Sequence, residues 1–534
     1  MLKYEKEYNR LCTRILEEGY PIYNERTGKT CHTIINHDFV YDVGKGEVPL
    51  LTNKQCFTVS AVAEILGYLR QYTDAQDFSD IGSPTWFANA SNPVWQDNPN
   101  CRSNTDMGEA YRFGKQGYFV EVTPAIYPTS VINKVEMQVK DVHYETLQNT
   151  EDYIGKEFES STSGTYRVTD YIGESSDKRI KFFQIKFKDT GTEMTIQKSQ
   201  IRNGNIKDYQ KVSVYGVGTV GCVVAKEDKW LYKAWTHMLE RCYSEKSKHY
   251  PNYGGRGVFV HQDWLNFQRF KEDVKGLENY YLAKVFPKEY TLDKDFFKSN
   301  CYAKHTCKWA SKKEQAVNTR NVKTYYVEGI YVKGLEFLAQ HLNISKNEAF
   351  GKVKRGEVEL ASKDVNISYC EVDPVKEVYC KLLEGVDDRR LIATAWLPHL
   401  QQKSCLVPCA FEHIWSLVDN KLSLTVTQRS GDIPLGIPFN SFSFCFLLKL
   451  MAKITGNEPD KVYHKIINAH VYDDQVEPLQ KQLSRTPLDI QPTLEISDWV
   501  NTLEDVVGNN KHAREYFTLT GYEHQGKISF PFST

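Results

Sequence analysis

The chain has 534 residues, of which 41% are hydrophobic and 25% are charged. This composition is typical of soluble globular proteins, and the length predicts three or four domains. The charged segment 1–10 lacks the apolar core of a signal peptide, and no apolar run approaches the ~20 residues that cross a bilayer, so we expect no membrane association. Thirteen cysteines without regular spacing favour reduced thiols in a cytoplasmic compartment.

The net charge of −1 conceals an uneven distribution. Residues 201–320 hold 22 Lys and Arg but only 13 Asp and Glu, a net +9, so the rest of the chain carries −10. A basic segment inside an acidic chain is typical of a nucleic-acid-binding part joined to another protein. Chance variation of surface charge is the alternative explanation.

In chain order, apolar residues at helical spacing first predict a helix over 58–69, capped by Thr58. Residues 82–117 are rich in Asn, Pro, Gly and Trp and predict loops. Residues 120–212 predict short strands separated by turns, among them 164–170 and 179–187.

Further along, we predict a helix over 230–241 and a small helix-turn-helix unit from two apolar-spaced segments, 335–342 and 346–354. From residue 372 the pattern changes, with helices predicted at 374–383 and 441–453 and strands at 391–395 and 422–428. This last part predicts a compact α/β or α+β enzyme.

The C-terminal third contains residue types that suit covalent chemistry on a phosphorylated substrate. Cys409 directly follows Pro408, and Arg389, Arg390 and Arg429 occur in two short segments nearby in the sequence. The arginine fork suits bidentate phosphate binding, and a thiolate beside such a clamp is a candidate nucleophile. Each piece alone is ambiguous, because a single cysteine is more often a core residue and an Arg-Arg pair is usually solvated.

The segment 428–440, QRSGDIPLGIPFN, closely resembles the nucleotide-binding signature of thymidylate synthases. Other motifs similar to this family's occur in the same order over residues 1–117 and 369–534. They are Arg26-Thr-Gly, the strand 48–52, Glu64 in the helix that follows, Trp86 with Asn89, Asp388-Arg-Arg with Ala395-Trp396, His470 with Tyr472, and Gly521-Tyr522. The resemblance is specific because many spaced motifs agree.

This resemblance implies an α+β fold, a mixed β-sheet covered by helices, in a twofold dimer. It implies that Cys409 attacks carbon 6 of the uracil of dUMP, that 5,10-methylenetetrahydrofolate delivers one carbon and a hydride, and that Glu64 transfers protons with ordered water. The dUMP-binding residues implied are Arg26, Gln428, Arg429, Ser430, Asn440, His470 and Tyr472, with Arg389 and Arg390 reaching across the dimer. Trp86, Asp432 and Gly436 are implied for the folate, and Asp432 also for catalysis.

The sequence departs from the family pattern at several positions. Ala410 follows the nucleophile where histidine is common, Leu397 replaces an asparagine, and Phe87 stands where aspartate usually follows the tryptophan. Phe113 occupies an expected tyrosine position, unless Tyr111 shifts into it, and the C-terminal sequence FPFST does not end as the family's closing tail does. These departures leave the nucleophile, the glutamate and the arginines in place.

Gly117 and Val372 lie 255 residues apart, although the corresponding segments are nearly adjacent in the family. The intervening sequence resembles phage-borne homing endonucleases of the HNH type, followed by their small helix-turn-helix modules. The residues that carry this are 213–221, 235–243, 250–258, 264–267, 292–295, 307–309, Asn318 and, for the module, 329–356. We therefore expect a separately folded α+β insertion, with a β-rich part at 118–210, an endonuclease-like part at 211–322 and a DNA-binding unit at 323–368 that contacts double-stranded DNA.

Cleavage by this insertion needs a general base and a caged divalent ion. Asp293, Asp295 and Asn318 would hold an ion such as Mg²⁺, but Lys294 stands where histidine would act as base, so an inert remnant is an alternative. Cys301 and Cys307 do not form a zinc pattern with other cysteine pairs. The insertion ends also lack the splice residues of an intein.

Three functional hypotheses stay open at this point. The leading one is a thymidylate synthase that binds dUMP, folate and a second copy of the chain in the cytoplasm, a host's cytoplasm if a phage encodes it. A dUMP hydroxymethylase would use the same scaffold with water in place of hydride. The third is an inactive synthase that hosts a DNA endonuclease.

Overall fold

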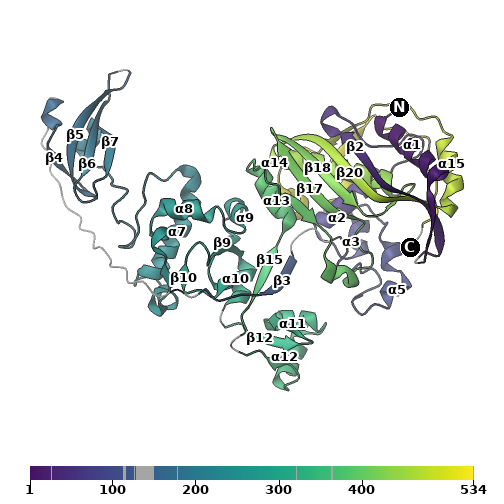
Figure 1. The fold of residues 1–534 in the computed structure, drawn as a ribbon, viewed down its shortest axis with the longest axis horizontal. Helices are drawn as coiled ribbons and strands as arrows, with labels where there is room; N and C mark the ends of the chain where they lie inside the picture. Colours follow the sequence, from purple (N-terminus) through teal and green to yellow (C-terminus); the bar gives the residue numbers. More distant parts are fainter. Residues whose placement is uncertain are drawn as a thin grey trace. The chain divides into compact units, whose positions relative to one another are not determined.

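The protein is described by a computed structural model for residues 1–25, 27–111, 116–125, 127, 150–176, 178–319, 321–362 and 365–532 (Figure 1). Its contacts divide the chain into two compact units. The first unit comprises residues 1–117 and 371–534, and the second comprises residues 118–370. We describe each unit separately.

The first unit is built on a mixed sheet of seven strands. The strands follow one another in the order β1 (Tyr20–Asn24), β2 (Lys29–Asp42), β20 (Glu458–Tyr472), β18 (Lys421–Gln428), β17 (Ala410–Val418) and β16 (Ile392–Thr394). The short strand β19 (Gly431–Asp432) also pairs with β20. Strand β20 pairs parallel with β18 and β19, and the other neighbours are antiparallel. Asp419 and Asn420 join β17 to β18 with φ of 49° and 63°, the backbone that a tight hairpin requires.

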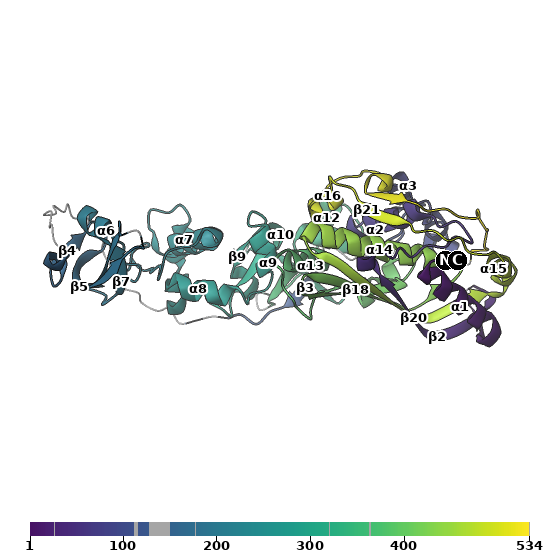
Figure 2. The same ribbon diagram turned by 90° about the horizontal axis from the view of Figure 1, so that it is seen from above.

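The helices of this unit pack against the sheet or against one another. They are α1 (Lys3–Glu18), α2 (Thr58–Leu69), α3 (Ala75–Asp80), α4 (Phe87–Ala90), α5 (Pro93–Gln96), α13 (Pro374–Leu383), α14 (Gly436–Thr455), α15 (Val476–Leu483) and α16 (Leu503–Val507). Helix α14 lies along β18 and β20, and α1 lies against β2 and β20 (Figure 2). Helix α13 packs against β16. A separate ribbon pairs β21 (Thr493–Ile496) with β22 (Phe517–Thr520).

The alternation of side chains along β18 explains which face is covered. Leu422, Leu424 and Val426 are buried toward the helices, whereas Ser423 and Thr425 point the other way and stay partly exposed. On the same open face, Val40 of β2 and Tyr463 of β20 are directly paired and both are about 40% exposed. One face of the sheet therefore forms the core, and the other presents apolar side chains to solvent.

Most of the secondary structure predicted for this unit is confirmed, with four corrections. Residues 48–52 form no strand, and the predicted loop 82–117 contains the short helices α4 and α5. Helices 58–69 and 374–383 have the predicted bounds, but Phe57 is the N-cap residue of α2 and Thr58 lies inside the helix, so the predicted cap is wrong. Helix α14 extends five residues further toward the N-terminus than predicted. Its length and apolar character would also suit a membrane span. However, 78% of its most apolar stretch is buried inside the protein, as in the core helix of a folded domain.

The second unit contains three small structural groups. The first is a four-stranded antiparallel sheet, β4 (Glu157–Ser160), β5 (Gly164–Glu174), β6 (Lys181–Phe187) and β7 (Glu193–Gln197), followed by α6 (Lys198–Asn203). It has its own apolar core, which includes Tyr166, Phe183 and Ile185. This confirms the predicted strands at 164–170 and 179–187.

The second group is mostly helical. Its helices are α7 (Lys229–Tyr243), α8 (Phe267–Val274), α9 (Tyr280–Val285) and α10 (Lys312–Asn318). Two short ribbons accompany them: β8 (Phe259–Val260) with β10 (Cys301–Tyr302), and β9 (Tyr290–Asp293) with β11 (Lys308–Ser311). Trp235 of α7 and Trp264 are fully buried, and the Trp235 indole donates to the Trp264 carbonyl at 2.7 Å, which fastens α7 to the segment before α8.

The third group contains the predicted helix-turn-helix. Helices α11 (Leu335–His341) and α12 (Lys346–Lys354) accompany a three-stranded sheet of β13 (Ile330–Lys333), β12 (Thr324–Val327) and β14 (Glu359–Leu360). Ser345 caps α12 by accepting from the Glu348 N–H. Where the chain passes between the units, β3 (Gln116–Glu121) pairs with β15 (Ile367–Val372), so the two ends of the long segment lie side by side.

Candidate active site

Cys409 lies in a loop that Arg429 holds in place. The Arg429 side chain donates from Nε to the Pro408 carbonyl at 2.9 Å and from Nη2 to the Val407 carbonyl at 2.8 Å. The same Nη2 lies 3.6 Å from the Cys409 sulfur, and the Arg429 N–H donates to the Cys409 carbonyl at 2.8 Å. The half-buried thiol therefore has a permanent positive charge beside it, which is the environment of reactive thiolates.

Glu64, on α2, is the carboxyl group of this site. It accepts hydrogen bonds from the Tyr68 hydroxyl at 2.9 Å and from the Thr85 hydroxyl, which itself lies 2.8 Å from the Ser83 hydroxyl. Burial raises the pKa of Glu64 to about 7, against the lowering effect of Thr85, Tyr68 and Ser83. A carboxyl group with this pKa exchanges its proton near neutral pH, as a general acid-base group must.

An aromatic stack joins Glu64 to Cys409. Tyr68 stacks on Tyr111 with ring centroids 4.7 Å apart and an angle of 12° between the rings. The Tyr111 hydroxyl oxygen accepts from the Cys409 N–H at 2.7 Å, and Trp86 packs edge-on against Tyr111 at 5.7 Å. Tyr111 has φ of 53°, an unfavourable backbone for a non-glycine residue, which the packing around it must maintain. Two of the three predicted catalytic groups, Cys409 and Glu64, thus belong to one packed cluster.

Gln428 and Asn440 form the polar wall next to the arginine. Asn440 Nδ2 donates to Gln428 Oε1 at 3.2 Å, and Gln428 Nε2 donates to the Ser430 carbonyl at 2.9 Å. Gln428 is buried, whereas Arg429, Ser430 and Asn440 are half-buried. The structure therefore places these four predicted residues together at the end of β18 and the start of α14.

Asp432 is connected to the C-terminal segment of the chain. Its Oδ1 accepts from the Leu435 N–H at 3.0 Å, and its Oδ2 accepts from Gln475 Nε2 at 2.8 Å. Burial raises the pKa of Asp432, and the hydrogen bond from Gln475 acts in the opposite direction. Gln475 Nε2 also donates to the Pro531 carbonyl at 3.1 Å, so the segment near the C-terminus is held next to Asp432.

Other contacts fix the same segment. The Tyr522 hydroxyl donates to the Leu51 carbonyl at 3.0 Å and accepts from the Cys56 N–H at 2.8 Å. Lys54 is buried, donates to the Pro434 carbonyl and lies 4.8 Å from the centroid of the Phe530 ring. Although the sequence ends differently from the expected closing tail, residues 521–532 cover the region between Lys54 and Asp432.

The other described residues predicted to bind dUMP or folate lie on β20, at the start of α14 and on the surface. His470 and Tyr472 are adjacent on β20 with ring centroids 5.2 Å apart, and His470 Nδ1 lies 2.9 Å from Asn468 Oδ1. Gly436 begins α14. Arg389 and Arg390 are exposed, and Arg390 pairs with the partly buried Asp388 at 3.1 Å. Arg26 and Phe113 lie outside the described residues.

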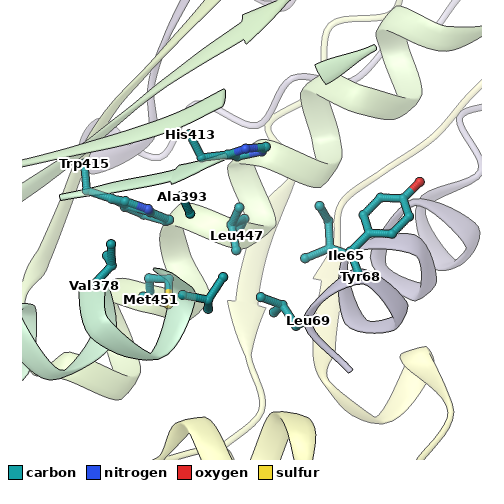
Figure 3. A pocket seen from close by; sticks show the side chains of 10 residues that line it. Ile65, Tyr68, Leu69, Val378, Ala393, His413, Trp415, Leu447 and Met451 are labelled. Carbon is teal, nitrogen blue, oxygen red and sulfur yellow. The ribbon is translucent and has the colours of Figure 1, made fainter. Parts of the chain in front are cut away.

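A small cavity lies behind the glutamate helix but is not a substrate site. It has a volume of about 30 Å³ and is lined by apolar side chains with Tyr68, His413 and Trp415 around it (Figure 3). Ile65, Leu69, Leu447 and Met451 point into it from α2 and α14. This volume is far below the ~300–1,000 Å³ of ligand pockets and the lining is mainly apolar, so the cavity is a packing gap.

Several residues of the site could not be identified from the sequence. Tyr68 and Thr85 were missed, although Tyr68 is four residues after Glu64 and therefore on the same side of the helix. Tyr111 appears in the sequence pattern only as a substitute for Phe113, because its contact with Cys409 depends on the fold of the loop before β3. No sequence pattern indicates Gln475, because its hydrogen bond with Asp432 joins residues that are far apart in the chain.

The three residues predicted to hold a divalent ion in the second unit already have partners. The Asn318 amide donates to the Tyr369 carbonyl and accepts from the Tyr369 N–H, both at 2.8 Å. Asp295 pairs with Lys294 at 2.6 Å, and Asp293 accepts from the Phe296 N–H at 2.9 Å. Burial and the neighbouring Asp295 raise the pKa of Asp293 to about 6. The backbone thus already engages Asn318, and among the residues described no group of three His, Cys, Asp or Glu side chains gathers that could hold a metal ion.

The raised pKa of Glu64 predicts a pH-dependent stability that Glu64→Gln removes. A carboxyl group whose pKa rises from 4.5 to about 7 on folding contributes stability below pH 4.5 and loses it as the pH rises through 7. Between pH 5 and pH 8 the free energy of unfolding of the wild type, relative to Glu64→Gln, should fall by about 2 kcal/mol. Denaturant titrations at both pH values measure this change.

Glu17→Gln provides the matched control, because Glu17 is an exposed carboxyl group on α1. The difference between the wild type and Glu17→Gln should vary little between the two pH values. Equal pH dependence in the Glu64 and Glu17 comparisons would contradict the assignment of a half-buried, proton-exchanging carboxyl group at Glu64.

Comparisons with known proteins agree with this arrangement. A family model described as thymidylate synthase matches residues 6–151 and 303–534, and the unmatched residues between them lie in the second unit. Curated thymidylate synthases from Shewanella frigidimarina, Shewanella pealeana and Aliivibrio fischeri are each 24% identical over 530 residues, which covers 99% of this chain and of each relative.

Proposed function

Because the chain belongs to the thymidylate synthase family, we propose that it methylates dUMP to dTMP with 5,10-methylenetetrahydrofolate and that Cys409 is its nucleophile. The observation that carries this proposal is the contact of Arg429 with the Cys409 sulfur at 3.6 Å, within a cluster that also contains Glu64. Family membership implies both substrates and a methyltransferase reaction. The residue roles that follow are our proposals.

Covalent catalysis starts with the thiolate of Cys409. Its sulfur forms a bond to carbon 6 of the uracil ring, and the electrons of the 5,6 double bond move to carbon 5, which becomes the nucleophile. The bound folate supplies the one-carbon unit and the hydride that reduces it. After carbon 5 loses its proton, the carbon–sulfur bond breaks and Cys409 leaves as thiolate, so the enzyme returns to its starting state.

The protein groups around Cys409 would move protons and bind the nucleotide. Glu64, with its pKa of about 7, would exchange protons with the base through ordered water. Arg429 and Ser430, with Arg26, would hold the phosphate, since the guanidinium fork fits a phosphate dianion. Asn440 would pair with the uracil edge, because an amide both donates and accepts.

The remaining roles concern the sugar and the folate. His470 and Tyr472 would bind the deoxyribose hydroxyl, and Gln428 would orient Asn440. Trp86, Asp432 and Gly436 would contact the folate, where the raised pKa of Asp432 suits a group that donates to a ring nitrogen or oxygen. The contacts of residues 521–532 with Lys54 and Gln475 would exclude water from that region.

A twofold dimer is part of this proposal. The open face of the seven-stranded sheet, with Val40 and Tyr463 among its exposed apolar residues, is the surface that a second copy would cover. Arg389 and Arg390 are exposed and would complete the phosphate site of the partner subunit. The cytoplasmic location expected from the sequence stays a prediction.

The test of the proposed function is product analysis with dUMP and methylenetetrahydrofolate. A thymidylate synthase releases dTMP and dihydrofolate, whereas a dUMP hydroxymethylase on the same scaffold releases hydroxymethyl-dUMP and leaves the folate at its tetrahydro level. The departures at Ala410 and Phe87 make this distinction necessary. Formation of the hydroxymethyl product would replace our proposal by the hydroxymethylase, and no product from folded protein would favour an inactive synthase.

For the second unit we propose a DNA-binding role. Helix α12 is capped by Ser345 and presents Lys346, Phe350 and Lys354 on its exposed side, with Lys354 Nζ 4.9 Å from the Phe350 ring centroid. A short basic helix that follows a turn suits the major groove, where lysines neutralise phosphates. A divalent ion such as Mg²⁺ at Asp293 and Asp295 stays a prediction, and we derive no cleavage step from it.

DNA binding by the full chain should weaken steeply with salt, because phosphate contacts release counterions. The variant with both Lys346→Glu and Lys354→Glu should bind less tightly, and the slope of log affinity against log salt should fall by about 2. Gel-shift titrations at several salt concentrations measure both quantities.

The control carries the same charge change in the first unit, at the exposed residues Lys6 and Lys421. The Lys6→Glu, Lys421→Glu variant should bind DNA as the wild type does. If the folded full chain binds no DNA at low salt, or if both double variants lose the same affinity, the second unit is not a DNA-binding module of this kind.

A further inference from the structure

A line of buried polar side chains extends from Gln428 into the core of the first unit. Beyond Gln428 it consists of His464 on β20, Tyr41 on β2, Ser441 on α14 and Tyr4 on α1, each 2% exposed or less. His464 Nε2 lies 2.8 Å from Gln428 Oε1, and its Nδ1 lies 2.7 Å from the Tyr41 hydroxyl. Ser441 Oγ lies 2.8 Å from the Tyr41 hydroxyl and 3.0 Å from that of Tyr4. Buried polar groups with several partners restrict one another's orientation.

The orientation of the Gln428 amide follows from its partners. Its nitrogen donates to the Ser430 carbonyl at 2.9 Å, which can only accept, so the amide oxygen must face Asn440 and His464. An amide oxygen only accepts. Both Asn440 Nδ2 and His464 Nε2 must therefore donate to it.

The protonation of His464 agrees with this direction. Burial lowers the pKa of His464 to about 3, so the ring is neutral at physiological pH and carries a single N–H. Because Nε2 must donate to Gln428, that hydrogen is on Nε2, and Nδ1 accepts from the Tyr41 hydroxyl. The single hydrogen of Tyr41 is then used, so in the contact between the two hydroxyl groups Ser441 donates to the Tyr41 oxygen. Phe444 of α14 packs edge-on against the ring at 4.9 Å and limits its rotation.

We propose that His464 is a positioning residue that makes the site select uracil over cytosine, which rests on the function proposed above. By donating to Gln428, it keeps that amide oxygen pointed at Asn440. One Nδ2 hydrogen of Asn440 is then bound to Gln428, and the other hydrogen and Oδ1 are presented to the base.

This presentation matches the uracil edge and opposes the cytosine edge. Uracil offers a carbonyl at position 4 and an N–H at position 3, which pair with the Asn440 nitrogen and oxygen respectively. Cytosine reverses both, so it requires Asn440 to turn over. That turn would place Asn440 Oδ1 against Gln428 Oε1, two acceptors facing each other, while His464 prevents Gln428 from turning as well.

The test compares dUMP and dCMP binding to the full chain by calorimetry. His464→Phe keeps an aromatic ring against Phe444 but removes the Nε2 donor. Loss of one buried hydrogen bond predicts that the ratio of dCMP to dUMP dissociation constants falls by about 10-fold. In turnover, the KM for dUMP should rise more than kcat falls, because the lost interaction orients the bound base.

Tyr41→Phe is the matched control, since it removes a neighbouring buried hydroxyl but leaves the Nε2 donor of His464 in place. Its base preference should stay within about 2-fold of the wild type, because the contact with Gln428 is kept. An equal loss of preference in both variants would reveal general loosening of the core and overturn the proposal. An unchanged preference in folded His464→Phe would overturn it as well.

A measurement on the wild type does not depend on how the variants fold. Nitrogen-15 NMR of the labelled histidines should show His464 neutral, with its hydrogen on Nε2, from pH 5 to pH 8. A hydrogen on Nδ1, or a charged ring in this range, would overturn the proposal even if dUMP binds. Failure of the wild type to bind dUMP, with the Nε2 tautomer present, would instead contradict the proposed function and leave the described network intact.

Discussion

Replacement of Cys409 by serine should lower dTMP formation by about 10³-fold or more, because the alcohol is a far weaker nucleophile than a thiolate at neutral pH. Binding of dUMP should change little, since Arg429 and the polar wall of Gln428 and Asn440 remain. Tritium release from labelled dUMP measures the turnover, and calorimetry measures the binding. Retention of more than a few per cent of the wild-type rate would remove Cys409 from the role of nucleophile.

Cys405→Ser supplies the control for this substitution. Cys405 lies four residues before Cys409 in the same loop region, and burial raises the pKa of its thiol to about 12. Such a thiol stays protonated and makes a poor nucleophile. The Cys405 variant should therefore keep most of the activity, which separates loss of the nucleophile from disturbance of the loop.

The sequence predicted the elements whose side chains repeat with a regular period. Helix α2 and strand β18 were predicted from such patterns and are present with nearly the predicted bounds. The predicted start of α14, residue 441, is too late by five residues. Gly436 and Pro438 lie in its first turn, where proline is tolerated because the N–H has no helical partner. The predicted N-cap of α2, Thr58, is wrong because the helix begins one residue earlier than a cap at Thr58 requires, and helix ends are the least certain part of such a prediction.

The candidate site was predictable where one short segment contains the partners. Residues 428–440 brought Arg429, Ser430 and Asn440 into the prediction together. The Tyr68–Tyr111 stack and the contact of His464 with Gln428 join residues from elements far apart in the chain, so no local pattern indicates them. The pairing of β3 with β15 is a partial exception, because an insertion that leaves a compact protein requires ends that lie close together.

The second large effect concerns the exposed arginines. If Arg390 serves the phosphate site of a partner subunit, Arg390→Ala and Cys409→Ser should each be nearly inactive as pure proteins. In a hybrid dimer, the chain with Arg390→Ala keeps its Cys409 and receives an intact Arg390 from the other chain. Random mixing makes half of the dimers hybrid with one working site each, so roughly a quarter of the wild-type activity should return.

A mixture of Cys409→Ser with Arg429→Ala is the control, because it distinguishes an arginine that serves its own chain from one that serves the partner. Arg429 contacts the Cys409 sulfur of its own chain at 3.6 Å, whereas the Arg390 side chain is 85% exposed and pairs with Asp388. Loss of Arg429 therefore damages the same site that keeps its cysteine, and no hybrid contains an intact site. Recovery of activity with Arg390→Ala and none with Arg429→Ala would place one arginine across the dimer and the other within the chain. An active species that sediments as a monomer, or equal behaviour of the two mixtures, would contradict a site shared between subunits.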